Sequence, residues 1–221
     1  MTYFVSDLHG EYELFCSLLE KINFSSDDTM YVCGDILEKG DNSLKLLKLI
    51  CTQNNIHCVL GNHDRSFLNY YRKIMESSPT DFDLVLQALQ EFFFDEDEAL
   101  TWDMVDYLDG LPYYIEADDF ICVHAGIPLD ENGFLMDLDK VSEEQFIFDR
   151  RFKDSDVIHN SDKCVFFGHT TTDDGKIITY KRPNKTGKSI KDYYKIHLDT
   201  GAWQNGILGC FCLEKCECIY A

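Results

Sequence analysis

The chain has 221 residues, 45% of them hydrophobic, and a formal net charge of −20. This size and apolar content allow one substantial core without a break in composition, so we predict a single domain spanning residues 1–221. The charge would repel a phosphate backbone, which argues against nucleic acid as the main substrate. Because no stretch approaches the ~20 apolar residues of a membrane span and no signal sequence precedes the first strand pattern, we expect a cytoplasmic protein that binds no membrane.

The first third of the chain alternates strand and helix patterns. Residues 2–6 have the pattern of a strand, and apolar residues at helical spacing follow over 14–22. A second strand over 30–33, a second helical pattern over 44–50 and a third strand over 57–60 repeat the order. This order predicts a parallel sheet whose functional site lies at the carboxyl ends of the strands.

The middle of the chain is helical by pattern from Asp64 to about Leu108, and we expect a helical, cap-like segment at about 65–110. One apolar stripe runs along it, for which we predict packing in a core or cap rather than ligand binding. The stripe consists of Phe82, Val85, Leu86, Leu89 and Phe93.

After Pro112 the chain becomes rich in strand patterns separated by turns that contain Gly, Asn and Asp. These patterns predict a second, more antiparallel sheet. The fold class we expect is therefore α/β, a two-sheet β-sandwich of mixed sheets flanked by helices. The strand candidates are 113–115, 119–124, 164–167, 176–180, 194–199 and 207–220.

Two features of the last third have simple structural explanations. Residues 176–195 carry seven Lys and Arg residues, which we interpret as a solvated hairpin in preference to a surface that recruits acidic phosphopeptides or polyphosphates. The ten cysteines of this chain lie mostly in apolar runs, so we expect reduced thiols. Cys210, Cys212, Cys216 and Cys218 resemble a metal knuckle, but we favour strand packing over zinc binding.

Polar side chains follow the first two predicted strands directly. Asp7 and His9 are two residues apart, so both can reach one ion while Leu8 points into the core. Asp35 takes the corresponding place after the second strand, where its two oxygens can bridge two cations, and Gly34 allows the close turn. An Asp-x-His pair alone is more often a cap or a turn, and only its position between a strand and a helix favours a metal site.

The later strands end in similar residues. Asn62 is an unusual metal ligand, and His63 adds a proton donor, although a helix N-cap at Asn62 or Asp64 also explains this motif. His124 and His169 each close an apolar run; a lone histidine there is usually structural, but its repetition makes chance a poor explanation. Together these residues supply ligands for two metal ions, and their oxygen and nitrogen atoms favour manganese, iron or zinc.

The ordered motifs resemble the phosphoprotein phosphatase (PPP) branch of the calcineurin-like metallophosphoesterases, in the compact form found in bacteria and phages. That form includes lambda-phage-like serine/threonine phosphatases and symmetrical diadenosine tetraphosphatases. The match runs from Asp7 to about Ala202 and includes a late Asp199-Thr200-Gly201-Ala202 motif. It is specific for the family but not for the substrate.

The resemblance implies a binuclear centre of divalent metal ions, with manganese preferred and iron or zinc as alternatives. It also implies attack on phosphorus by a metal-bridging hydroxide, protonation of the leaving group by His63, and orientation of His63 by Glu38. The implied ligands are Asp7, His9 and Asp35 for one ion, and Asp35, Asn62, His124 and His169 for the other.

The chain departs from the family at the phosphate-binding positions. The family motif Gly-Asp-x-x-Asp-Arg-Gly has Glu38 and Lys39 here, so the carboxylate is one methylene longer and the bidentate fork of arginine is lost. Arg150 aligns with the phosphate clamp of the family's Trp-x-Arg motif, in which Phe148 replaces the Trp, and Arg151 is the alternative clamp. The implied phosphate-binding residues are Lys39 and one of these two arginines.

Our expectation for the function is a metal-dependent phosphoesterase acting on phosphate monoesters, foremost a serine/threonine protein phosphatase with a phosphorylated protein or peptide as substrate. The alternative is a symmetrical bis(5'-nucleosyl)-tetraphosphatase acting on a dinucleoside polyphosphate. A second alternative is a catalytically weakened module that binds a phosphorylated ligand. The intact ligand set argues against pure binding. The sequence predicts no oligomeric state.

Overall fold

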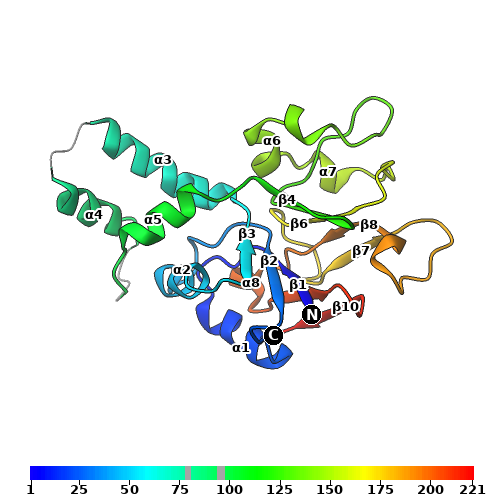
Figure 1. The fold of residues 1–221 in the computed structure, drawn as a ribbon, viewed down its shortest axis with the longest axis horizontal. Helices are drawn as coiled ribbons and strands as arrows, with labels where there is room; N and C mark the ends of the chain where they lie inside the picture. Colours follow the sequence, from blue (N-terminus) through cyan, green and yellow to red (C-terminus); the bar gives the residue numbers. More distant parts are fainter. Residues whose placement is uncertain (78–80, 94–97) are drawn as a thin grey trace.

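The computed structural model describes residues 1–77, 81–93 and 98–221. Within these ranges two five-stranded sheets pack face to face, and helices cover their outer faces (Figure 1). The strand order is β10-β9-β1-β2-β3 in the first sheet and β4-β5-β6-β8-β7 in the second. The predicted fold class, a two-sheet sandwich of mixed sheets flanked by helices, is confirmed.

The first sheet is built around three parallel strands, β1 (Thr2–Val5), β2 (Thr29–Val32) and β3 (Ile56–Cys58). Helix α1 (Tyr12–Ile22) connects the first two strands, and α2 (Ser43–Cys51) connects the second and third. All five elements lie close to their predicted bounds. This agreement follows from the strong local periodicity of the segment.

A C-terminal hairpin completes the first sheet. Strands β9 (Gly209–Cys212) and β10 (Glu217–Tyr220) pair with each other, and β9 pairs antiparallel with β1. The prediction that residues 207–220 join a second, more antiparallel sheet was therefore wrong. In the described residues each sheet has two parallel and two antiparallel pairings. The hairpin covers the edge of β1 that would otherwise be unpaired.

The hairpin also decides the packing of the C-terminal cysteines. Cys210 and Cys212 face the core between the first sheet and its helices, whereas Cys216 and Cys218 pack toward the core between the two sheets. The two pairs therefore point to opposite faces and cannot bind one ion together. All ten cysteines are free thiols, as expected.

The second sheet has a parallel centre and antiparallel edges. Strands β5 (Phe120–Val123), β6 (Cys164–Phe167) and β8 (Tyr193–His197) are parallel, and β4 (Tyr114–Glu116) and β7 (Ile178–Lys181) pair antiparallel at the two edges. Since β6 and β8 run in the same direction, the hairpin between β7 and β8 lies at the end of the sheet opposite to the carboxyl end of β6.

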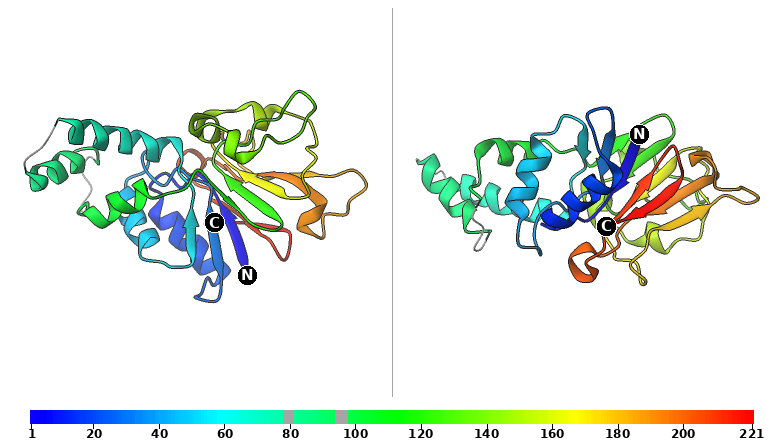
Figure 2. Two further views of the ribbon diagram at one scale, coloured as in Figure 1. Left: turned by 45° about the horizontal axis from the view of Figure 1, so that its top comes forward. Right: turned by 90° about the horizontal axis from the view of Figure 1, so that it is seen from below.

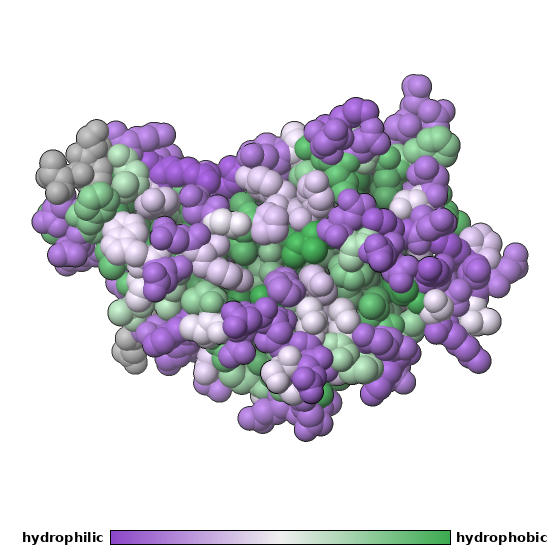
Figure 3. Space-filling model, in the orientation of Figure 1, coloured by the Kyte–Doolittle hydropathy of each residue, from purple (hydrophilic) through white to green (hydrophobic). Residues whose placement is uncertain are grey.

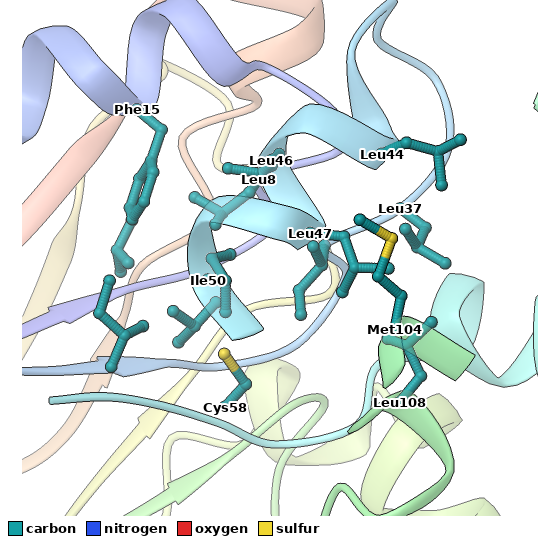
Figure 4. Packing of buried hydrophobic residues seen from close by; sticks show 14 of the residues in the cluster. Leu8, Phe15, Leu37, Leu44, Leu46, Leu47, Ile50, Cys58, Met104 and Leu108 are labelled. Carbon is teal, nitrogen blue, oxygen red and sulfur yellow. The ribbon is translucent and has the colours of Figure 1, made fainter. Parts of the chain in front are cut away.

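The sandwich has three apolar layers. Between the sheets Phe4 stacks on Phe166, with ring centroids 3.7 Å apart. Outside the first sheet, buried side chains of α2 such as Leu47 meet Met104 and Leu108 (Figure 4).

Short helices that no sequence pattern predicted complete the fold: η1 (Leu138–Lys140), α6 (Glu143–Phe148), α7 (Arg151–Asp154), η2 (Ile190–Asp192) and α8 (Ala202–Asn205).

The segment predicted to be helical over 64–108 contains α3 (Asn62–Glu76), α4 (Phe82–Gln90) and α5 (Trp102–Asp109), which we call the helical arm. Residues 78–80 and 94–97 of that prediction lie outside the described residues. The arm projects from the sandwich beyond α2 (Figure 2).

The apolar stripe of the arm is largely buried. Val85, Leu89 and Phe93 lie in the core as predicted, but Phe82 is 59% exposed. Apolar side chains show on the arm amid a mostly hydrophilic face (Figure 3). Among the described residues, no helix is both long and apolar enough to cross a membrane.

Candidate metal centre

The strand ends of both sheets meet at one edge of the sandwich. Asp7 donates its backbone N–H to the carbonyl of Gly34, 3.1 Å away, which joins the ends of β1 and β2. Across the sandwich, the backbone N–H of His169 lies 3.0 Å from Oδ2 of Asp7. The backbone itself thus brings the polar residues that follow β1, β2 and β6 together.

Asp35 lies at the centre of this edge. Its Oδ2 is 3.4 Å from Nε2 of His124 and 3.6 Å from Nε2 of His9. Its Oδ1 accepts a hydrogen bond of 2.9 Å from the backbone N–H of His63. Two groups with the spacing of a metal site share this carboxylate, one with Asp7 and His124 and the other with His9 and His63. The arrangement suits a carboxylate that bridges two cations.

Two imidazoles of the centre are held in one tautomer. Nδ1 of His124 lies 2.7 Å from the carbonyl oxygen of Cys33, and Nδ1 of His9 lies 3.1 Å from that of Leu37. Since a carbonyl only accepts hydrogen bonds, each Nδ1 carries a proton, and Nε2 of each ring faces Asp35. Burial lowers the pKa of His9 to about 4, so it stays neutral. Imidazole nitrogens that face a carboxylate suit a divalent cation held between them.

The remaining predicted ligands converge on the same point. Oδ1 of Asn62 lies 2.9 Å from Nε2 of His124 and 2.7 Å from Nδ1 of His169. Asp7 is 2% exposed, and burial raises the pKa of its carboxyl well above the usual value, with Asp199 and Asp35 adding to the effect. A cation would offset this concentration of buried acceptors. The structure therefore brings all six predicted ligands together, in a donor set that suits two divalent ions.

The backbone of the centre is strained. Most of the non-glycine residues with positive φ among the described residues are predicted site residues. Residues other than glycine rarely adopt this backbone conformation. Such strain persists only where surrounding structure holds it, and it clusters at functional sites. The site residues with positive φ are Asp7, His9, Asp35, Glu38, Lys39 and His169.

Two glycines allow the strand ends to approach. A Cβ on Gly61 would lie 2.1 Å from Oδ1 of Asp35, and one on Gly168 would lie 2.0 Å from Oδ2 of Asp7. Neither position has space for a side chain. The loops after β3 and β6 can therefore lie directly against the two carboxylates.

Asp64 holds the loop after β2, a role that the sequence did not predict beyond a helix cap. Its carboxylate accepts hydrogen bonds from the backbone N–H groups of Asp35 and Ile36, both at 3.0 Å, and of Leu37 and Gly61, both at 3.1 Å. The side chain is fully buried. The only signal in the sequence was a carboxylate in the first turn of the helix that carries Asn62.

His63 and Glu38 form a pair beside the predicted ligands. Nδ1 of His63 hydrogen-bonds to Oε2 of Glu38, and its ring lies edge-on to His9 with centroids 4.8 Å apart. Burial opposes protonation of His63, but the hydrogen bond to Glu38 and the charge of Asp35 outweigh it and raise the pKa. The pair can supply a proton at the edge of the centre.

The three predicted phosphate-binding residues have different positions relative to the centre: two contact its histidines and one does not. Nζ of Lys39 lies 2.8 Å from Nε2 of His9 and also over the ring of Trp203, a neighbour that the sequence did not predict. Nε of Arg150 lies 3.3 Å from Nε2 of His169, whereas Arg151 pairs with Asp149 through its guanidinium group. Lys39 and Arg150 therefore border the centre, and Arg151 is turned to a different partner.

The basic segment 176–195 lies mostly in the hairpin at the far end of the second sheet, away from the centre. This position supports a solvated hairpin over a recruiting surface beside the site. Lys195 is the exception to that interpretation, because it is 1% exposed. Its Nζ donates to the carbonyls of Phe152, Lys153 and Ser155, at 2.9, 3.1 and 2.7 Å, and so ties β8 to the end of α7.

Comparisons with known proteins agree with this geometry. The model of the calcineurin-like phosphoesterase family matches residues 2–198. A symmetrical bis(5'-nucleosyl)-tetraphosphatase of Aggregatibacter actinomycetemcomitans is 37% identical over 133 residues, which cover 58% of this chain and 45% of that protein. The enzyme of the same name from Salmonella paratyphi C is 34% identical over 131 residues, covering 57% and 43%. The match thus spans less than half the length of these relatives.

Solved structures share the fold. A protein provisionally described as a diadenosine tetraphosphatase superposes with a TM-score of 0.73 at 20% identity, covering 100% of this chain and 92% of that one. A serine/threonine phosphatase from Saccharomyces cerevisiae superposes with a TM-score of 0.53 at 12% identity, covering 100% and 78%. At these identities the likeness concerns the fold alone.

Proposed function

The chain belongs to the calcineurin-like phosphoesterase family, whose members are metal-dependent hydrolases, and on this premise we propose that it hydrolyses dinucleoside polyphosphates symmetrically. One observation carries the proposal: relatives at 34–37% identity are named symmetrical bis(5'-nucleosyl)-tetraphosphatases. The serine/threonine phosphatase that we expected first from the sequence has weaker support, because the yeast phosphatase is only 12% identical.

The positions of the side chains support the roles that the family resemblance implies. Asp7 and Asp35 would hold one divalent ion together with His9, whose Nε2 lies 3.9 Å from Oδ1 of Asp7 and 3.6 Å from Oδ2 of Asp35. Asp35 would share a second ion with Asn62, His124 and His169. When bound, such ions lower the pKa of water and neutralise phosphoryl oxygens.

The residues around the ligands would complete the reaction. His63, oriented by Glu38, would donate a proton to the leaving oxygen. Lys39 and Arg150 border the ligands with positive charge and would bind the phosphate chain. Arg150 is the better clamp, since Arg151 is already paired with Asp149.

A substrate panel tests the proposal. Purified protein is treated with a chelator, reloaded with manganese, and offered diadenosine tetraphosphate and peptides carrying phosphoserine, phosphothreonine or phosphotyrosine. We expect adenosine diphosphate as the sole nucleotide product and a kcat/KM for the dinucleotide well above that for any peptide. A preference for the peptides would reinstate the protein phosphatase, and tight phosphopeptide binding without turnover of any substrate would identify a binding module.

A further inference from the structure

A second concave site adjoins the metal centre on the side of His63. It is a cavity of about 480 Å³ lined, among the described residues, by Glu38, Tyr70, Glu91 and Phe92. Glu38 belongs to both sites, because the residue whose carboxylate contacts His63 also lines the cavity. A group leaving from the side of His63 would therefore leave next to this cavity.

The walls of the cavity are aromatic. Tyr70 of α3 and Phe92, which follows α4, are stacked, with ring centroids 5.9 Å apart and planes 29° apart. The ring of Phe92 also packs edge to face against Phe67, with centroids 5.4 Å apart, so the aromatic platform of Tyr70 and Phe92 is packed into the arm. Tyr70 is 36% exposed and leaves its surface accessible. A flat ring on such a platform gains stacking energy with little dependence on its identity.

Besides the hydroxyl of Tyr70, the polar side chains that line the cavity among the described residues are two carboxylates. Glu38 and Glu91 repel phosphate, so the cavity does not suit the polyphosphate chain itself. They can accept hydrogen bonds from hydroxyl or amino groups. A flat aromatic ring joined to a polyhydroxyl unit meets both demands, and the volume lies within the usual range for a small-molecule pocket.

From these observations we propose that the cavity is the nucleoside subsite for the leaving nucleotide, with the base against Tyr70 and Phe92 and the ribose hydroxyls toward Glu38 or Glu91. The proposal rests on the proposed function and adds the part of the molecule that selects a nucleotide. A phosphopeptide needs no flat platform beside its scissile phosphate, so its occupancy of the cavity is an outcome that the test must exclude.

Inhibition measurements test the subsite separately from the activity. Manganese-dependent hydrolysis of nitrophenyl phosphate is measured with adenosine diphosphate or inorganic pyrophosphate as competitor, at metal concentrations in excess of both. If the cavity binds the nucleoside, adenosine diphosphate inhibits about tenfold more tightly than pyrophosphate, and Tyr70→Ala removes this advantage, whereas Tyr70→Phe keeps it. The two inhibition constants are compared within each variant, so a change in the turnover of nitrophenyl phosphate, whose own ring can stack on Tyr70, does not affect the comparison.

The control is Leu84→Ala, which removes a side chain of the same arm that is 61% exposed and does not line the cavity. It should leave the preference for adenosine diphosphate intact. Equal inhibition by the two competitors in the wild-type protein, or an undiminished preference in Tyr70→Ala, overturns the subsite. Because these readouts do not use diadenosine tetraphosphate, failure to hydrolyse the dinucleotide would refute the proposed function without deciding the subsite.

Discussion

The edge that carries the predicted metal ligands and the rim around it are built by different means. At the edge, Asp7, Asp35 and His124 are 2%, 2% and 0% exposed, and backbone groups of neighbouring loops fix them. At the rim, Lys39 and Arg150 are exposed, and each contacts the edge through one side-chain nitrogen. The fold thus fixes the residues that do the chemistry, while the contacts that select a substrate depend on a few exposed side chains.

The strongest test of the edge is removal of its central carboxylate. We expect Asp35→Ala to lower manganese-dependent hydrolysis of nitrophenyl phosphate by about a thousandfold or more, because it removes a contact to both ions and several kcal/mol of transition-state stabilisation. Calorimetric titration with manganese should show loss of binding. Asp27→Asn, at an exposed carboxylate in a turn, should behave as wild type. Undiminished turnover after chelation would show that the edge is not a metal centre.

The next largest effect concerns His63, where edge and rim meet. His63→Ala should depress hydrolysis of phenyl phosphate by about a hundredfold or more, since the phenolate leaves poorly without a proton. Nitrophenyl phosphate, whose leaving group needs little protonation, should lose much less. Parallel kcat measurements on this matched pair decide the role. Equal losses would mean that His63 is structural or a ligand.

Substitution of Asp64 tests whether this one buried carboxylate holds the backbone at the edge in its conformation. Asp64→Asn replaces an acceptor oxygen by an amide donor that faces backbone N–H groups, so we expect a loss of about 1–3 kcal/mol in the free energy of unfolding. Displacement of the Asp35 loop should also lower kcat/KM about tenfold. Urea unfolding and kinetics measure the two effects. Asp103→Asn, at an exposed carboxylate in the first turn of α5, is the matched control.

The same contrast explains what the sequence predicted. The six ligand candidates were identifiable because each follows a strand pattern, and parallel strands must deliver their carboxyl ends to one edge. The sequence marked Asp64 only as a helix cap and did not mark Trp203 at all, since most partners of Asp64 and the partner of Trp203 are distant in sequence. The C-terminal hairpin was assigned to the wrong sheet for a related reason: periodicity specifies a strand but not its neighbour.

Lys39 tests the rim with a smaller expected effect. If its ammonium group binds phosphate, Lys39→Ala should weaken transition-state stabilisation by about 1.5 kcal/mol, or roughly tenfold in kcat/KM. Lys39→Arg should be tolerated, because it keeps the charge and adds a bidentate donor. Kinetics on one substrate compare the two variants. A change of less than about twofold in Lys39→Ala would leave the phosphate contact to Arg150.

The smallest effect lies behind the rim, where His159 packs against Phe152 and is 1% exposed. Burial, with Arg182 and Lys195 adding to it, lowers the pKa of His159 to about 4, below its ordinary value of 6.5. As the pH falls, His159 is protonated in the unfolded chain before it is protonated in the folded protein. His159 should therefore not affect the free energy of unfolding above pH 7, and should lower it increasingly as the pH falls below 6.5. Between pH 8 and pH 6 the loss should be about 1 kcal/mol.

Urea unfolding at the two pH values measures this slope. His159→Gln keeps a donor for the carbonyl of Tyr194, which Nε2 of His159 contacts at 2.6 Å, but it removes the titration, so the variant should lose about 1 kcal/mol less than wild type on acidification. His57→Gln, at an exposed histidine of β3, should leave the slope unchanged. An unchanged slope in His159→Gln would mean that water reaches His159 in the folded protein. The segment that contains Phe152 and Arg150 would then be less firmly packed than the burial of His159 indicates.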